Sequence, residues 1–185
     1  MAICCERGGI HVEKNFLAIT TFAILLFVAF LIFYNGNKPL NGNDIESIEK
    51  VITLEGFEDS SIEILEIKDF DEIRVVAFLS NNNPGYIQFK KNEDGNYIKN
   101  FVEVKNDATL GSFSPTIPVL LLVTNYENEI AEMQVTINGE TLEQNFTPND
   151  ATVAWIDLPK DVSDKYTFRN YKYFDKDGTL IKEFN

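Results

Sequence analysis

Aromatic rings alternate along a predicted strand near the C-terminal end of the sequence, and Trp155 lies in a neighbouring predicted strand. Because alternate residues of a strand point to opposite faces, one face would carry Tyr166, Phe168 and Phe174, and the other Arg169, Tyr171 and Tyr173. Exposed rings beside an arginine can stack on sugar faces or hold a peptide, whereas covered rings belong to the core. The candidate ligand-binding residues are Trp155, Tyr166, Arg169, Tyr171 and Tyr173.

Histidine and cysteine occur only in the first 14 residues, as His11, Cys4 and Cys5. Catalytic triads, Cys-His pairs, histidine or thiolate metal sites and disulfides are therefore excluded from residues 35–185. Carboxylate pairs remain available, but no pair stands out among the many acids. We expect no catalytic residue, no metal ligand and no cofactor, and a protein that is not an enzyme. A carboxylate-dependent hydrolase is the least favoured alternative.

The chain is strongly acidic, with 29 acidic and 16 basic side chains and a net charge of −13. Two of each kind lie in the first 14 residues, so the whole excess belongs to the rest of the chain. Such a surface repels nucleic acid and anionic lipid headgroups, which both need basic patches. We therefore expect no nucleic-acid partner. The acidity serves solubility or attracts a basic partner.

An uncharged run of 19 residues, FLAITTFAILLFVAFLIFY, covers residues 16–34. A helix needs about 20 apolar residues to cross a bilayer, and cleaved signal peptides have shorter apolar regions. We expect residues 15–34 to be an uncleaved signal anchor in the cell membrane. The flanking Lys and Arg are nearly balanced, but the short tail favours a cytoplasmic location for residues 1–14. The remainder would then be extracytoplasmic, behind a flexible linker at 35–43.

The next part, residues 44–105, reads as one helix followed by four antiparallel strands. Asn43 can cap the helix, and Ile45, Ile48, Val51 and Ile52 form an apolar stripe. The predicted strands cover residues 61–68, 72–80, 86–91 and 97–105. Turns are predicted at 82–85 and 92–96. We expect the helix to cover an antiparallel four-stranded sheet.

Residues 106–118 read as a connecting loop, and residues 119–185 as a second, all-β unit. Six strands are predicted, at 119–125, 130–138, 140–146, 151–158, 165–175 and 179–184. Asn138-Gly139 and Asp177-Gly178 are the dipeptides of two-residue type I′ hairpins. Short strands with turns at this spacing favour a small Ig-like sandwich. The expected fold class is α+β, preceded by a transmembrane helix.

Two hairpin patterns carry a resemblance to a protein family. One runs from Arg74-Val-Val-Ala-Phe to Pro84-Gly-Tyr-Ile-Gln-Phe-Lys-Lys-Asn-Glu-Asp-Gly-Asn-Tyr, and the other is Gln-Val-Thr-Ile-Asn-Gly-Glu-Thr-Leu within residues 130–143. Together they resemble uncharacterised, membrane-anchored extracytoplasmic proteins of Gram-positive bacilli. The resemblance implies an anchored, two-part exported module and no catalytic activity.

These observations favour a single-pass, membrane-anchored interaction module that contacts another envelope protein. A cell-wall glycan or peptide binding module is the alternative, and it rests on the aromatic strand at 165–175.

Overall fold

The computed structural model describes residues 19–30, 40–57, 60–159 and 165–184. Residues 19–30 are helical. The chain divides into two compact units, Met1–Pro39 and Leu40–Asn185. In the described ranges, no helix combines the length and the apolar character needed to span a membrane. The predicted tail at 1–14 and both ends of the predicted anchor at 15–34 lie outside the described residues.

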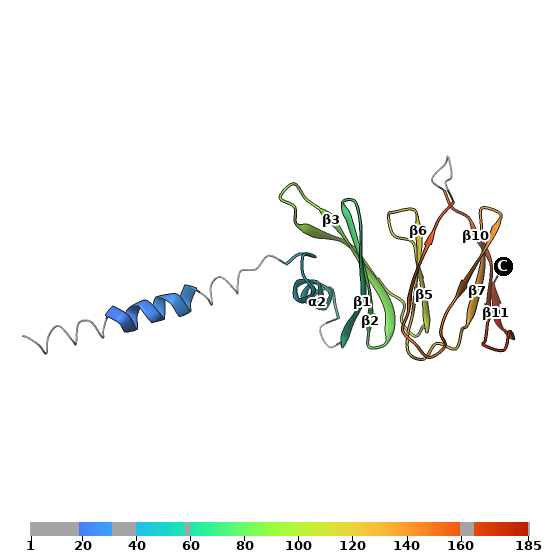
Figure 1. The fold of residues 1–185 in the computed structure, drawn as a ribbon, viewed down its shortest axis with the longest axis horizontal. Helices are drawn as coiled ribbons and strands as arrows, with labels where there is room; N and C mark the ends of the chain where they lie inside the picture. Colours follow the sequence, from blue (N-terminus) through green and yellow to red (C-terminus); the bar gives the residue numbers. More distant parts are fainter. Residues whose placement is uncertain (1–18, 31–39, 58–59, 160–164, 185) are drawn as a thin grey trace, which may run out of the picture. The chain divides into compact units, whose positions relative to one another are not determined.

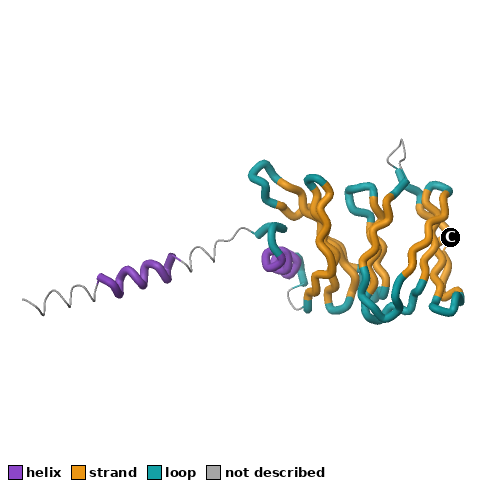
Figure 2. Tube along the Cα trace, in the orientation of Figure 1, coloured by secondary structure: helices purple, strands orange, loops and turns teal. Residues whose placement is uncertain are grey.

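The second unit is an α+β structure in which one helix and three antiparallel sheets form successive layers (Figures 1 and 2). The helix is α2 (Ile45–Leu54). The first sheet has the order β1 (Ile62–Phe70), β2 (Ile73–Ser80), β3 (Asn83–Lys91) and β4 (Tyr97–Val104). The second has the order β5 (Leu110–Phe113), β6 (Val119–Thr124) and β9 (Val153–Asp157). The third has the order β11 (Leu180–Phe184), β10 (Phe168–Phe174), β7 (Glu132–Ile137) and β8 (Glu140–Asn145).

Helix α2 begins one residue later than the sequence predicted. Asp44, not Asn43, is the N-cap, and its carboxylate accepts a 2.9 Å hydrogen bond from the backbone N–H of Ser47. An aspartate at this position satisfies a free N–H of the first turn and complements the helix dipole. The buried apolar stripe consists of Ile48, Val51 and Ile52.

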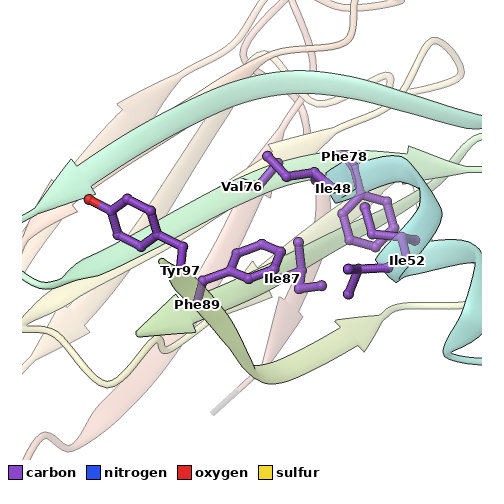
Figure 3. Close-up of a cluster of buried hydrophobic side chains, with 8 residues drawn as sticks. Ile48, Ile52, Val76, Phe78, Ile87, Phe89 and Tyr97 are labelled. Carbon is purple, nitrogen blue, oxygen red and sulfur yellow. The ribbon is translucent and has the colours of Figure 1, made fainter. Parts of the chain in front are cut away.

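The first core lies between α2 and one face of the first sheet, as predicted (Figure 3). Its sheet residues are at alternate positions of β2 and β3, because alternate side chains of a strand point to the same face. They are Val76 and Phe78 of β2 and Ile87 and Phe89 of β3, joined by Tyr97 of β4.

The other face of the first sheet packs on the second sheet, and the second sheet packs in turn on the third. Val75, Ala77 and Leu79 of β2 lie in one of these interlayer cores. Strand β6 contributes Leu121 and Val123 to the same core, whereas its alternate residues, Leu120 and Leu122, face the third sheet. All six residues of β6 are buried. A strand covered on both faces reads as a continuous apolar run, which is the pattern of this segment.

The predicted connecting loop at 106–118 contains the strand β5 and is tied to the first sheet. Gln88 is fully buried, and its amide exchanges hydrogen bonds of 2.7 and 2.9 Å with the side chain and backbone of Thr116. A buried amide needs such partners to offset its lost hydration. The division into units at 44–105 and 119–185 stays a prediction.

The turn after β2 differs from the expected one at 82–85. It consists of Asn81 and Asn82, whose φ angles are 47° and 64°, and Pro84 already belongs to β3. Asparagine tolerates this left-handed conformation better than most residues, so an Asn-Asn pair can form a type I′ turn. The Asn138-Gly139 hairpin has the expected positive φ angles of 51° and 92°.

The Asp177-Gly178 turn is longer than the predicted two-residue hairpin. The backbone N–H of Asp175 donates to the carbonyl of Thr179 at 2.9 Å, and the Asp175 carboxylate accepts from the N–H groups of Asp177 and Thr179. Only Gly178 of the dipeptide has a positive φ angle, 75°. Hydrogen bonds from an aspartate to its own turn stabilise this longer loop.

Residues 40–43 of the predicted linker are held against the first sheet; residues 35–39 lie outside the described residues. The N–H of Gly42 donates to the carbonyl of Tyr97 at 2.7 Å. Asn43 accepts a 2.9 Å hydrogen bond from the N–H of Tyr97 and donates to the side chain of Asn96 at 2.8 Å. The chain is therefore attached to β4 before it enters α2.

Candidate functional site

A groove of about 490 Å³ lies where β5, an edge strand of the second sheet, meets β11, an edge strand of the third. This volume is within the usual range of ligand-binding clefts. Its lining comes from the start of β5, the loop between β6 and β7, β10 and β11. The lining residues are Asp107, Ala108, Thr109, Leu110, Glu127, Glu129, Ile130, Tyr173, Ile181, Lys182 and Phe184.

The acidic rim of the groove is presented by a loop that two buried asparagines hold in place. Asn125 donates to the carbonyl of Asn82 at 2.7 Å and accepts from the N–H of Glu127 at 2.9 Å. Asn128 is fully buried, and its amide donates to the carbonyl of Ile130 at 2.9 Å. Between them, Glu127 and Glu129 are exposed. Buried amides of this kind fix a loop while its carboxylates remain in water.

The floor of the groove is aromatic. The rings of Tyr173 and Phe184 meet edge to face, with centroids 6.2 Å apart, and Tyr171 stacks on Tyr173 at 6.3 Å. The ammonium group of Lys182 lies 4.4 Å from the centroid of Phe184, a cation–π distance. Burial raises the pKa of Tyr173 to about 12, with a smaller contribution from Tyr171. Tyr173 therefore stays neutral at physiological pH.

A β-bulge in β10 corrects the predicted assignment of its faces. Asn170 has a φ angle of 53°, and the pairing with β7 shifts between Arg169 and Lys172. The extra residue reverses the alternation, so Phe168, Tyr171 and Tyr173 all pack on the core between the second and third sheets. Arg169 is exposed.

Tyr166 also packs on this core, whereas Trp155 of β9 lies in a different one. Trp155 faces the first sheet, where its indole N–H donates to Glu66 at 2.9 Å and its ring lies 5.5 Å from Phe70. The structure thus separates the five candidate residues into two interlayer cores and one exposed side chain. Tyr173 is the one that lines the groove, and a ligand-binding role for the five stays a prediction.

No sequence pattern pointed directly to the other groove residues. Asp107 falls in the predicted loop, and Glu127 and Glu129 are two acids among many. The strand predicted at 179–184 carries Lys182 and Glu183 beside its apolar residues, so nothing in the sequence marked it as a binding edge. Among the described residues, no group of three His, Cys, Asp or Glu side chains is placed to hold a metal ion.

Comparison with models of protein families finds no match to this chain, and comparisons with curated proteins and with solved structures find none either.

Proposed function

We propose that this protein is a single-pass, membrane-anchored extracytoplasmic module that binds another envelope protein and performs no catalysis. Residues 15–34 would be the anchor, with residues 1–14 in the cytoplasm. In support, the helix at 19–30 exposes large apolar side chains such as Phe22, Phe27 and Phe30, each more than half exposed. Water strongly disfavours this much apolar surface, whereas a bilayer accepts it.

We further propose that the second and third sheets form an Ig-like sandwich. Their orders, β5-β6-β9 and β11-β10-β7-β8, correspond to strands A-B-E and G-F-C-C′ when the seven strands are lettered along the chain. Domains of this architecture serve many binding functions, so this assignment supports an interaction role by analogy alone.

The observation that carries the proposed function is the apolar surface exposed on the edge strand β11. Leu180, Ile181 and Phe184 are 46%, 46% and 47% exposed, beside a groove with an aromatic floor. Large apolar side chains exposed on an edge strand are typical of surfaces that bind another protein.

A wall glycan or peptide is the second candidate ligand, because the rings of Tyr173 and Phe184 line the same groove. Aromatic rings stack on sugars as well as on peptide side chains. A carboxylate hydrolase has less support: Asp107, Glu127 and Glu129 are all exposed, whereas a general acid usually needs a desolvated site.

The test of orientation uses the absence of cysteine from residues 35–185. A Glu140→Cys variant in intact cells should react with a membrane-impermeant maleimide, whereas the parent protein with Cys4 and Cys5 should not. Labelling of the parent as well as the variant, or of neither before lysis, would overturn the orientation.

The test of function is photo-cross-linking in cells from a reactive residue at Ile181 in the full-length protein, with a matched residue at Thr141 of β8. We expect one dominant protein, identified by mass spectrometry, from position 181. Wall fragments alone, or no product from either position, would overturn the protein-interaction role.

A further inference from the structure

The two edges of the third sheet differ in the apolar surface that they expose. Strand β8, at one edge, reads Glu-Thr-Leu-Glu-Gln-Asn, and its charged side chains Glu140 and Glu143 are exposed. Strand β11, at the other edge, carries Leu180, Ile181 and Phe184 with nearly half of each side chain in water. Charged residues on an edge block pairing with foreign strands, and apolar residues invite it. Strand β11 also carries two charged residues, Lys182 and Glu183, so the two edges differ in the large apolar side chains that β11 exposes rather than in charge.

The groove lies directly beside the edge strand β11, so a strand added to β11 would continue the sheet across it. In the pairing of β10 with β11, Tyr173 lies opposite Lys182 and Tyr171 opposite Phe184. These four side chains therefore share the face that looks toward the groove. Every second side chain of an added strand would point to that face as well. An apolar side chain there would cover Phe184. Ile181 lies at the register shift of this pairing and also lines the groove, so it belongs to the same contact surface.

The charge of the groove selects the partner. Its rim has three exposed carboxylates, Asp107, Glu127 and Glu129, against the single ammonium group of Lys182. The net charge of the chain, −13, adds a long-range attraction for cations. A second copy paired through β11 would bring two such acidic rims together, which like charges oppose. A neutral glycan would leave the carboxylates without partners.

We propose that β11 and its groove bind an extended, cationic segment of a partner protein by strand addition. Backbone hydrogen bonds to the edge of β11 hold the segment, and every second side chain faces the groove, where apolar ones cover the aromatic floor and Lys or Arg ones face the three carboxylates. The proposal rests on the interaction role argued above and gives that role a site and a partner chemistry.

Binding is tested with the full-length protein in phosphatidylcholine nanodiscs, with empty nanodiscs as the blank. The probe is a fluorescein-labelled peptide of paired lysines and valines, Lys-Lys-Val-Val-Lys-Lys-Val, so that each face of the strand carries both kinds of side chain; its length, about seven residues, is that of an ordinary strand. Matched peptides replace lysine by glutamate, or valine by serine. Fluorescence anisotropy should show saturable binding of the Lys-Val peptide and at least tenfold weaker binding of the other two.

Charge is tested with a triple variant, Asp107→Asn, Glu127→Gln and Glu129→Gln, which should weaken binding of the Lys-Val peptide about tenfold at low salt. The matched control, Glu49→Gln, Asp94→Asn and Glu140→Gln, removes the same charge from exposed positions elsewhere. It should bind nearly as the parent does. Equal weakening by the two triple variants would mean nonspecific attraction and would overturn the proposal.

The edge is tested with Ile181→Ser and Ile98→Ser, which remove the same side chain from edge strands of different sheets, each 46% exposed. Only the first should weaken binding. Two further Lys-Val peptides carry N-methyl groups on odd or on even residues, so that each lacks the N–H groups of one edge. One of them should lose binding and the other should keep it. Equal behaviour of the two methylated peptides would overturn strand addition.

The cellular cross-linking separates this proposal from the proposed function. A partner captured from Thr141 but not from Ile181, together with no binding of the Lys-Val peptide, overturns the groove and leaves the interaction role standing. No protein captured from either position overturns both.

Discussion

The guanidinium group of Arg74 donates two hydrogen bonds of 2.7 Å, one to each carboxylate oxygen of Asp69. Its remaining nitrogen donates to the carbonyl of Gly42 at 2.7 Å, and its Cζ atom lies 4.1 Å from the ring centroid of Tyr97. A single side chain thus joins the β1–β2 hairpin, the start of β4 and the segment that leads into α2. Three of the predictions below concern this connection.

Replacing Arg74 by lysine should lower the free energy of unfolding by about 2 kcal/mol, because an ammonium group cannot make the same three planar contacts. Urea unfolding followed by circular dichroism measures the change. The control is Lys99→Ala, which removes a 2.7 Å ion pair with Glu55 in which each side chain is about one-third exposed. That loss should be about 0.5 kcal/mol. Equal losses would mean that the Arg74 contacts have no special value.

Acid should weaken the fold partly through Asp69. The hydrogen bond from Arg74 lowers the pKa of this carboxyl, against the opposing effect of burial. A lowered pKa stabilises the fold above the ordinary aspartate value of about 3.9, and that stability is lost as the pH falls through the folded-state pKa. Asp69→Asn should therefore flatten the decline in unfolding free energy below about pH 4. Asp94→Asn, in an exposed hairpin, should not; parallel curves for all three proteins would contradict the prediction.

Alkali should weaken the fold through Tyr86, whose pKa burial raises to about 12, with a smaller contribution from Glu103. Above about pH 10 the unfolded chain loses this proton while the folded chain keeps it, so the unfolding free energy falls as pH rises. Tyr86→Phe should remove up to about 2 kcal/mol of the fall between about pH 10 and pH 12. Urea midpoints at neutral and alkaline pH measure it. An unchanged fall in the variant would count against a buried, protonated Tyr86.

Gly42→Ala should destabilise the protein by about 2 to 3 kcal/mol. A Cβ atom at residue 42 would lie 2.7 Å from two ring carbons of Phe89, which is fully buried and has no room to move. The measurement is a double-mutant cycle with Phe89→Leu. The smaller leucine leaves space for the new methyl group. The double variant should therefore lose about 1 kcal/mol less unfolding free energy than the sum of the two single losses. Strict additivity would show that the close contact is not the cause.

The fluorescence of Trp155 should not change when wall glycan is added. Trp155 is the only tryptophan, and it lies between the first two sheets with its indole N–H bonded to Glu66. Its fluorescence should shift to longer wavelength on unfolding, yet stay unchanged when soluble peptidoglycan fragments are added. A saturable change with those fragments, absent with an unrelated polysaccharide of similar size, would favour the glycan alternative.

Strand positions were predictable because apolar segments, alternating or continuous, are bounded by turn residues along most of this chain. The predicted strand at 72–80 corresponds to β2, and that at 119–125 to β6, within one or two residues. Hairpins at Asn138-Gly139 and at 92–96 also follow local turn chemistry, which acts over four or five residues. The helix boundary was wrong by one residue, because Asn43 and Asp44 are both good caps and only tertiary contacts assign Asn43 to β4.

The candidate site was less predictable, for two physical reasons. A bulge at Asn170 changes which rings face inward, and a single sequence shows no pattern that marks a bulge. The groove, moreover, depends on which edge strands meet when sheets stack. The stacking of the sheets brings Tyr173 and Glu127 into the lining of one groove and places Trp155 in another core. Strand periodicity does not predict such long-range contacts.

The attachment of residues 40–43 also sets how the folded unit would respond to mechanical tension. A pull on the chain from residue 39 would act first on Gly42 and Asn43, whose hydrogen bonds to Tyr97, Asn96 and Arg74 share the load. Hydrogen bonds loaded together resist more force than bonds loaded one after another. Under tension, α2 and the cores behind it would remain folded until this short segment detached.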